Sequence, residues 1–176
     1  NVWQATFELG YPFGPLIRML TLTGQRLSEV AKCLWSDIDF NDRKWEITVA
    51  RAKNKNGHIV HISEPLLHEL EQLREMAKFE YLFTTTGVTP VSGFSKAKRR
   101  IDKLCGVRDW TFHDLRRTFA TISTESLGCD PVVVDRILNH VNGSVKGVAA
   151  VYQRGQYLEQ RKEVLNKWAN FLGRIV

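Results

Sequence analysis

The stretch from Thr111 to Thr121 constrains the fold most, because it combines a helical apolar pattern with side chains able to do chemistry. It reads T-F-H-D-L-R-R-T-F-A-T. His113 lies three residues before Arg116 and four before Arg117, so either arginine shares a helical patch with the imidazole, and the spacing leaves the choice open. The apolar residues recur at helical spacing and predict one buried face. They are Leu115, Phe119 and Ile122.

An imidazole beside a guanidinium is suited to phosphate chemistry. Arginine binds two oxygens in one plane, and histidine moves protons near neutral pH. A histidine and an arginine three apart on a helix are more often both solvated on the surface. The pair is therefore a hypothesis that needs support from the rest of the chain.

The length of the chain predicts one domain, and its positive charge favours an anionic partner. A chain of 176 residues with 43% hydrophobic content can bury a core, and its length fits one domain better than two. The net charge is +6, and nucleic acid is the leading partner for such an excess, although plain solubility also explains it. Residues 92 to 104 are expected to form a basic helix able to lie along a DNA backbone. Its clustered cations are Lys96, Lys98, Arg99, Arg100 and Lys103.

The cysteines and the apolar runs exclude several protein classes. Cys33, Cys105 and Cys129 form no C-x-x-C pair, which supports neither a disulfide framework nor a zinc site. No apolar run reaches membrane-spanning length, and the first residues lack the pattern of a secretory signal. We expect a soluble, cytoplasmic protein without a membrane partner, and we find no motif for a metal or another cofactor.

The remaining patterns predict a mainly α fold with a small antiparallel sheet, the α+β class. Glycines and prolines between positions 10 and 15 are expected to interrupt regular structure before a helix at about 16 to 23. Trp45, Ile47 and Val49 alternate with polar residues, and a second apolar run follows Asn56-Gly57, which predicts a hairpin. Further helices are expected from near residue 26, from 64 to 76, from 92 to 104, from 131 to 140 and from 157 onward.

Two further cations are expected at exposed turns. Arg26 precedes a helix, and Glu29 could simply pair with it at the surface, a contact worth about 0.3 kcal/mol. Strand parity puts Lys53 and Lys55 on the face of the apolar strand residues, so one ammonium at the hairpin tip can point toward a working surface. Parity does not choose between the two lysines.

The last third of the chain adds a histidine and two tyrosines. His140 ends a helix, where a lone histidine often serves only the electrostatics of the terminal carbonyls. Tyr152 follows a glycine-containing stretch, and Tyr157 begins a last amphipathic helix over residues 157–176. That helix is expected to pack either on its own domain or on a neighbour. Its apolar seam consists of Leu165, Trp168, Leu172 and Ile175.

Taken in order, these segments resemble the catalytic domain of the tyrosine recombinases, or phage integrases. They are T-G-Q-R-L-S-E with L-W-S-D-I-D, the lysine-bearing hairpin, H-D-L-R-R-T-F-A-T, L-N-H and a tyrosine twelve residues on. Each piece alone is weak, but the ordered set is specific and covers about residues 16 to 157. The chain looks like the subgroup encoded by temperate phages and genomic islands. The resemblance implies that residues 1–176 are a single catalytic domain of that fold, without the DNA-clamping domain that precedes it in the family.

The resemblance also implies roles for individual residues. Glu29 would steady Arg26, and Tyr157 is the reserve nucleophile because the gap from His140 to Tyr152 is longer than in many members. The implied catalytic residues are Arg26 as first arginine, Lys53 as hairpin lysine, His113 with Arg116 as H-x-x-R pair, His140 at the second histidine position and Tyr152 as nucleophile. The expected DNA contacts are Lys96, Lys98, Arg99, Arg100 and Arg117.

The function that the resemblance implies is site-specific recombination, integrating or excising a mobile element through a 3'-phosphotyrosyl intermediate without metal or ATP. The implied partners are double-stranded DNA attachment sites and other protomers in a synaptic tetramer, with room for an accessory DNA-bending protein, at the bacterial nucleoid. One alternative is a type IB topoisomerase, which shares the chemistry but reseals the same strand. The other is a catalytically silent DNA-binding regulator, against which the presence of every candidate catalytic residue argues.

Overall fold

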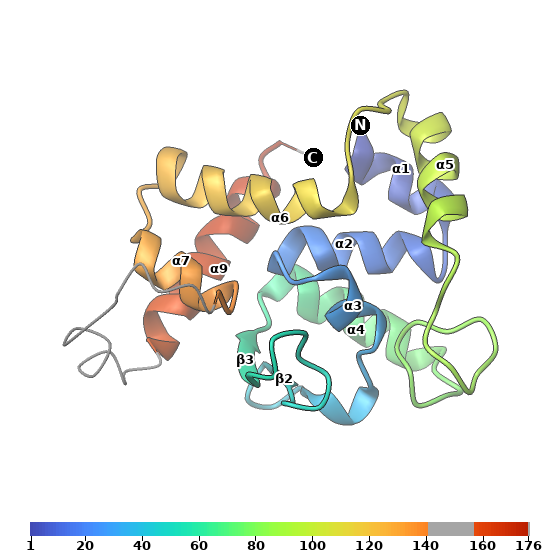
Figure 1. Cartoon of the computed structure of the whole chain (residues 1–176), viewed down its shortest axis with the longest axis horizontal. Coiled ribbons are helices and arrows are strands. Elements are labelled where there is room, and N and C mark those ends of the chain that lie inside the picture. The colour runs from blue at the N-terminus through green and yellow to red at the C-terminus, as the bar shows by residue number, and fades with distance from the viewer. Residues whose placement is uncertain (141–156, 176) are drawn as a thin grey trace.

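The computed structural model describes residues 1–140 and 157–175 of the chain. The described part is mainly helical with one small antiparallel sheet (Figure 1), which confirms the predicted α+β class. None of its helices combines the length and the apolar character needed to cross a membrane. The elements are α1 (Val2–Leu9), α2 (Phe13–Thr23), α3 (Leu27–Ala31), β1 (Ile38–Asp39), β2 (Lys44–Ile47), β3 (His58–His61), α4 (Glu64–Glu75), α5 (Phe94–Cys105), α6 (Phe112–Thr121), α7 (Pro131–Ile137) and α9 (Leu158–Leu172).

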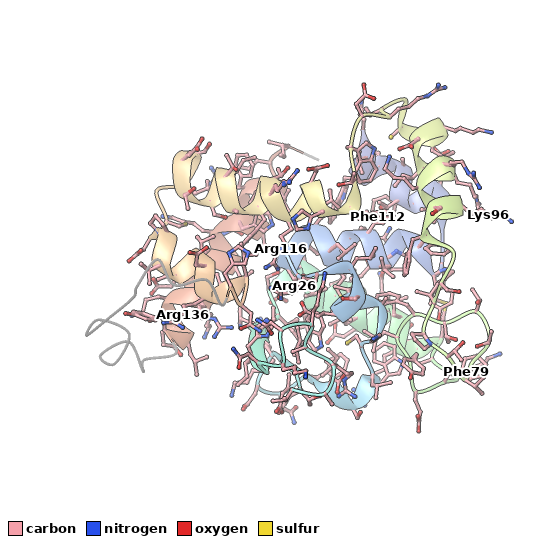
Figure 2. The ribbon with its side chains drawn as sticks, viewed as in Figure 1. Arg26, Phe79, Lys96, Phe112, Arg116 and Arg136 are labelled. Atoms are coloured by element: carbon pink, nitrogen blue, oxygen red, sulfur yellow. The ribbon has the colours of Figure 1, made fainter. Side chains whose placement is uncertain are left out.

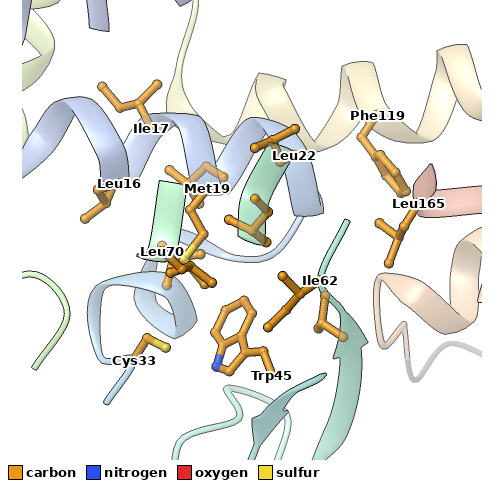
Figure 3. Close-up of a cluster of buried hydrophobic side chains, with 14 of the residues drawn as sticks. Leu16, Ile17, Met19, Leu22, Cys33, Trp45, Ile62, Leu70, Phe119 and Leu165 are labelled. Carbon is orange, nitrogen blue, oxygen red and sulfur yellow. The ribbon is translucent and has the colours of Figure 1, made fainter. Parts of the chain in front are cut away.

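The core is organised around α2, which is buried along most of its length and contacts α1, α3, α4, α6 and α9. Figure 3 shows the apolar side chains of α2 among partners from other elements. The largest side chains of the core outside α2 are fully buried, and each stabilises the fold by about 1.5 to 3 kcal/mol. They include Trp45 of β2, Phe119 of α6 and Trp168 of α9. This packing fixes the position of the residues that follow the C-terminus of α2.

α2 begins at Phe13, earlier than the sequence pattern predicts. The expected interruption at Gly14 and Pro15 is wrong, because both residues lie in the first turn, where proline is tolerated since N–H groups there lack helical partners. Gly14 also allows a close approach, because a Cβ there would lie 2.2 Å from the carbonyl oxygen of Thr6 in α1. The glycine therefore lets α1 cross α2.

The sheet is antiparallel in the order β1-β2-β3, and Trp45 pairs with Val60 across the predicted hairpin. Trp45 and Ile47 are buried, as their alternation with polar residues predicts. β1 is an element that the sequence did not predict, because two residues are too short to show alternation.

The hairpin connection is longer than a tight turn, and it changes the expected placement of the lysines. β2 ends at Ile47, and Val49 beyond it is 59% exposed. Residues 48–57 form a loop of turns, so the predicted strand parity of Lys53 and Lys55 is wrong. Both lysines are exposed on this loop, and their positions depend on its hydrogen bonds.

The C-terminal helix α9 packs on its own chain, against α2, α4 and α7 (Figure 1). Leu165, Trp168 and Leu172 are buried, and the Trp168 indole donates a 2.8 Å hydrogen bond to the carbonyl of Thr21 at the end of α2. The helix ends at Leu172, and Ile175, expected in the same seam, is 61% exposed.

The glycine after α2 yields a prediction about stability. Gly24 has φ 65°, and a Cβ there would lie 2.7 Å from Phe119 and 3.2 Å from Leu138. Gly24→Ala should lower the free energy of unfolding by about 1 to 2 kcal/mol from the left-handed backbone, and by about 1 to 3 kcal/mol more from overpacking. Urea denaturation of the wild type and of Gly24→Ala measures the loss in the free energy of unfolding.

The matched control is Gly106→Ala after α5. Gly106 has φ 72° and no atom within 4 Å of an added Cβ, so only the backbone cost applies. Equal losses in the two variants would contradict the close packing of Phe119 and Leu138 on Gly24.

Candidate active site

Arg116 is a buried arginine held between the ends of two helices. Its side chain comes from α6 and the residue is only 4% exposed. One guanidinium nitrogen donates to the carbonyl of Gly24, at 2.9 Å, and the other terminal nitrogen donates to the carbonyl of Leu138. Desolvation, and next the cation of Arg26, lower the pKa of Arg116 to about 10, so it stays charged at neutral pH.

Arg26 lies beside Arg116 (Figure 2) and is held by a buried carboxylate. Glu29 is 2% exposed, and it accepts hydrogen bonds from the Arg26 backbone N–H at 3.2 Å and from Nη1 at 3.0 Å. Arg26 Nη2 donates to the carbonyl of Asn139 at 3.2 Å. The alternative prediction that Glu29 pairs with Arg26 at the surface is therefore wrong, because the Glu29 side chain is buried.

Glu29 also holds the loop that carries Lys53. The backbone N–H of Lys53 donates to Glu29 Oε1 at 3.3 Å, and the same oxygen accepts from Arg26 Nη1. Two residues earlier in the loop, Arg51 forms an ion pair with the buried carboxylate of Asp37. The first arginine and the lysine loop thus share one anchor, although they lie far apart in the sequence.

His113 lies in the first turn of α6, and two sets of contacts fix that turn. Asp114 accepts hydrogen bonds from the backbone N–H of Thr111 at 2.8 Å and from its hydroxyl at 2.7 Å, which closes the helix start. The neighbouring Phe112 ring packs edge-on against Phe94 of α5, at 6.5 Å between centroids. The exposed His113 side chain is therefore presented from a rigid helix end.

The electrostatics of His113 favour a neutral ring. Its pKa lies below the ordinary value because of desolvation first, and then because the cations of Arg117, Arg116 and Lys53 face it, although Asp114 opposes them. The charge of Lys53 is among those that act on this ring. The neutral imidazole is the form that can accept a proton, while the neighbouring cations lower its basicity and Asp114 raises it.

His140 follows α7 and is oriented by a carboxylate on that helix. Its Nδ1 lies 2.9 Å from Asp135 Oδ1, and its backbone N–H donates to the Asp135 carbonyl at 3.1 Å. Asn139, the residue before it, supplies the carbonyl that Arg26 contacts. His140 therefore lies at the C-terminal end of α7, whose carbonyls the two arginines contact.

Of the two candidate nucleophiles, Tyr152 and Tyr157, the structure describes only Tyr157. Tyr152 lies outside the described residues. Tyr157, the reserve nucleophile, is the N-cap residue before α9, has φ 48° and packs against the hydrophobic core. The role of nucleophile therefore stays a prediction for Tyr152.

The expected DNA contacts separate into exposed and internally paired side chains. Lys98 contacts Asp102 at 2.6 Å and lies 4.4 Å from the centroid of the Trp110 ring. Arg117 is exposed beside His113 and pairs with Asp114. Figure 2 places Lys96 on α5, far from Arg26 and Arg116. The exposed cations of α5 are Lys96, Arg99, Arg100 and Lys103.

Three polar residues that the sequence did not single out lie behind the arginines. His58 of β3 is hydrogen-bonded to both Gln25 and Asn139. Periodicity could not reveal this cluster, because its members lie on segments far apart in the chain. The available signals were the T-G-Q-R-L-S-E and L-N-H motifs, which contain Gln25 and Asn139 but from which only Arg26, Glu29 and His140 received roles. In residues 1–140 and 157–175 no group of three or more metal-ligating side chains occurs.

The chain is similar to known proteins over most of its length. The model of the phage integrase family matches residues 9–155. The chain is 28% identical over 156 residues to prophage integrase IntA of Escherichia coli (strain K12), covering 88% of this chain and 37% of that relative. It spans about two-fifths of the length of the curated relatives it matches.

Solved structures share the fold. The integrase from mycobacterium phage Brujita aligns with a TM-score of 0.65 at 18% identity, covering 88% of this chain and 50% of that one. A lambda integrase dimer bound to a COC' core site aligns with a TM-score of 0.61 at 17% identity, covering 83% and 56%. These likenesses confirm the predicted fold.

The burial of Glu29 predicts a large effect for a small substitution. Glu29→Gln keeps the size of the side chain but removes the charge that pairs with Arg26. We expect the free energy of unfolding to fall by about 2 to 4 kcal/mol, because a guanidinium is left without its buried counter-ion. Thermal and urea denaturation measure the loss.

The control for this prediction is Glu64→Gln. Glu64 pairs with Arg43 at 2.5 Å, but both side chains are exposed, so the loss should stay below about 1 kcal/mol. If Glu29→Gln lowered the free energy of unfolding no more than Glu64→Gln, the buried carboxylate would not be what holds Arg26 and the loop of Lys53.

Proposed function

Because the chain belongs to the phage integrase family, we propose that it is the catalytic domain of a site-specific DNA recombinase. The observation that carries the proposal is the pair of arginines held side by side by three backbone carbonyls and Glu29. The charges of Arg116 and Lys53 both act on the ring of His113. Such a cluster is suited to a phosphodiester, which is an anion with two non-bridging oxygens.

The arginines would stabilise the transition state. Attack on a phosphodiester gives a five-coordinate phosphorus that carries an additional negative charge. Arg26 and Arg116 would neutralise that charge, with His140 donating a further hydrogen bond. Their guanidinium groups are fixed before substrate binds, so little reorganisation is needed during the reaction.

The proton transfers follow from the remaining residues. The phenolic oxygen of Tyr152 would form a bond to phosphorus, and its proton would pass to His113, since a tyrosine of pKa about 10 is protonated at neutral pH. The bond from phosphorus to the 5' oxygen would break, and Lys53 would protonate that oxygen as a general acid. The product is a 3'-phosphotyrosyl enzyme with a free 5' hydroxyl. Attack by another strand's hydroxyl then reseals DNA without ATP.

The partners of the proposed reaction are DNA attachment sites and further protomers. A lambda integrase, a structural neighbour, was solved as a tetramer bound to a Holliday junction. By analogy, we place this chain in a synaptic tetramer on double-stranded DNA at the nucleoid, where an accessory DNA-bending protein would help to bring sites together. The exposed cations of α5 and Arg117 would contact the DNA backbone.

A nicked suicide DNA duplex tests the nucleophile. Incubation with the wild type should give a covalent protein–DNA adduct, because the cleaved end cannot be resealed. Tyr152→Phe should abolish the adduct, since it lacks the attacking oxygen, whereas Tyr157→Phe should retain it. Denaturing gel electrophoresis detects the adduct. Survival of the adduct in Tyr152→Phe and its loss in Tyr157→Phe would assign the nucleophile to Tyr157.

The basic helix yields a separate prediction about DNA affinity. Arg99→Gln combined with Arg100→Gln should weaken DNA binding, and should reduce the slope of log affinity against log salt by about 0.9 per lost phosphate contact. Lys98→Met is the control, because the Lys98 ammonium is already paired with Asp102. Fluorescence anisotropy at several salt concentrations measures both slopes. An unchanged slope in the double variant would remove α5 from the DNA interface.

A further inference from the structure

His58 occupies the centre of a hydrogen-bond network behind the arginine pair. Its Nε2 lies 3.0 Å from Gln25 Oε1, and its Nδ1 lies 3.0 Å from Asn139 Nδ2. Gln25 follows α2 and Asn139 follows α7, whereas His58 begins β3. The imidazole therefore connects the sheet to the two helix ends that hold the arginines.

The partners of the network define the state of the ring. Gln25 Nε2 donates to the carbonyls of Thr23 and Ile137, so its Oε1 is the atom that faces His58. Asn139 Nδ2 lies 2.6 Å from the Asn56 carbonyl, 3.2 Å from Asn54 Oδ1 and 3.0 Å from His58 Nδ1, so its two hydrogens are shared among three acceptors and a group with no acceptor capacity faces Nδ1. Only a neutral ring with its proton on Nε2 can accept from Asn139 and donate to Gln25 at once.

The surrounding charges support the neutral form. Desolvation lowers the pKa of His58 most, followed by the cations of Arg161 on α9, Arg26 before α3 and Arg116 on α6, to about 3. The donor of Asn139 and the acceptor of Gln25 complete the environment of the ring. A proton on Nδ1 would place one donor against another.

Asn139 transmits the contact of His58 to the proposed site. Its backbone is left-handed, with φ 50°, and its carbonyl accepts from both Arg26 Nη2 and Asn54 Nδ2, the latter at 2.7 Å. Its side chain contacts Asn54 and Asn56, which lie on the loop of Lys53. Asn139, like Glu29, thus connects the first arginine to the lysine loop, and His58 contacts its side chain.

We propose that His58 is a positioning residue: as a neutral imidazole it holds Asn139, and through Asn139 it aligns Arg26 and the Lys53 loop. This inference rests on the proposed function and assigns His58 no contact with the substrate. A misplacement of a catalytic group by about 1 Å can slow a reaction about 100-fold, so a residue of this kind acts on the chemical step. It should affect the rate at saturating DNA more than the affinity for DNA.

The kinetic test compares two substitutions of His58 on the suicide duplex. His58→Leu removes both hydrogen bonds and should slow adduct formation about 100-fold at saturating DNA, with DNA affinity within about twofold. His58→Asn places an acceptor near the position of Nδ1 and should recover at least about tenfold of that loss. His61→Leu, the same change on the same strand, should cleave at the wild-type rate. A wild-type rate in His58→Leu, or equal losses in His58→Leu and His58→Asn, would overturn the proposal.

A second measurement does not depend on catalysis. Nitrogen-15 NMR of the wild-type chain should show the His58 ring neutral, with its proton on Nε2, from about pH 8 to pH 5. A ring that titrates near the ordinary histidine pKa, or that carries its proton on Nδ1, would overturn the inference even if the variants failed to fold. If the ring behaves as expected but the wild type forms no adduct, the proposed function fails instead.

Discussion

The structure depends on hydrogen bonds between the carbonyls at two helix C-termini and the guanidinium groups of two arginines. The last carbonyls of a helix have no partner within it and carry partial negative charge. α2 and α7 end close together and present the carbonyls of Gly24, Leu138 and Asn139, which accept hydrogen bonds from Arg116 and Arg26. The guanidinium groups supply donors to carbonyls that lack partners within their helices. The carbonyls in turn supply the acceptors without which burial of a guanidinium would be costly. The hydrophobic packing around α2 holds this meeting point in place.

The same helix ends place the groups around them in different surroundings. Arg116 comes from a helix packed on α2, and its guanidinium is enclosed. Lys53 is exposed on a loop that is held by hydrogen bonds to Glu29 and Asn139, by the ion pair of Arg51 with Asp37 and by the burial of Ala52 in the core. The proposed charge-stabilising group is therefore enclosed and preorganised, whereas the proposed proton donor is exposed.

The sequence predicted those features that depend on local signals. Pro65 and the pair Asp130-Pro131 mark the starts of α4 and α7, and the alternation around Trp45 marks β2. Strand parity failed for Lys53 because β2 stops at Ile47, and a loop has no period to extrapolate. The cluster around His58 left no local trace, because a hydrogen bond between distant segments needs only one residue from each. The proposed catalytic roles came from the order of the motifs, which reports a shared fold rather than a distance.

Charge composition alone also conceals how the cations are used. The chain carries a net charge of +6, yet several of its cations face inward. Arg116 donates to helix-end carbonyls, Arg161 of α9 donates to the carbonyl of Ile59, and Lys98 pairs with Asp102 beside Trp110. These groups hold elements together, and they are not available as flexible surface contacts. A phosphate approaching the arginine pair would therefore meet a field set by the interior, whereas the exposed cations of α5 would act on the flanking backbone, where salt screens them most.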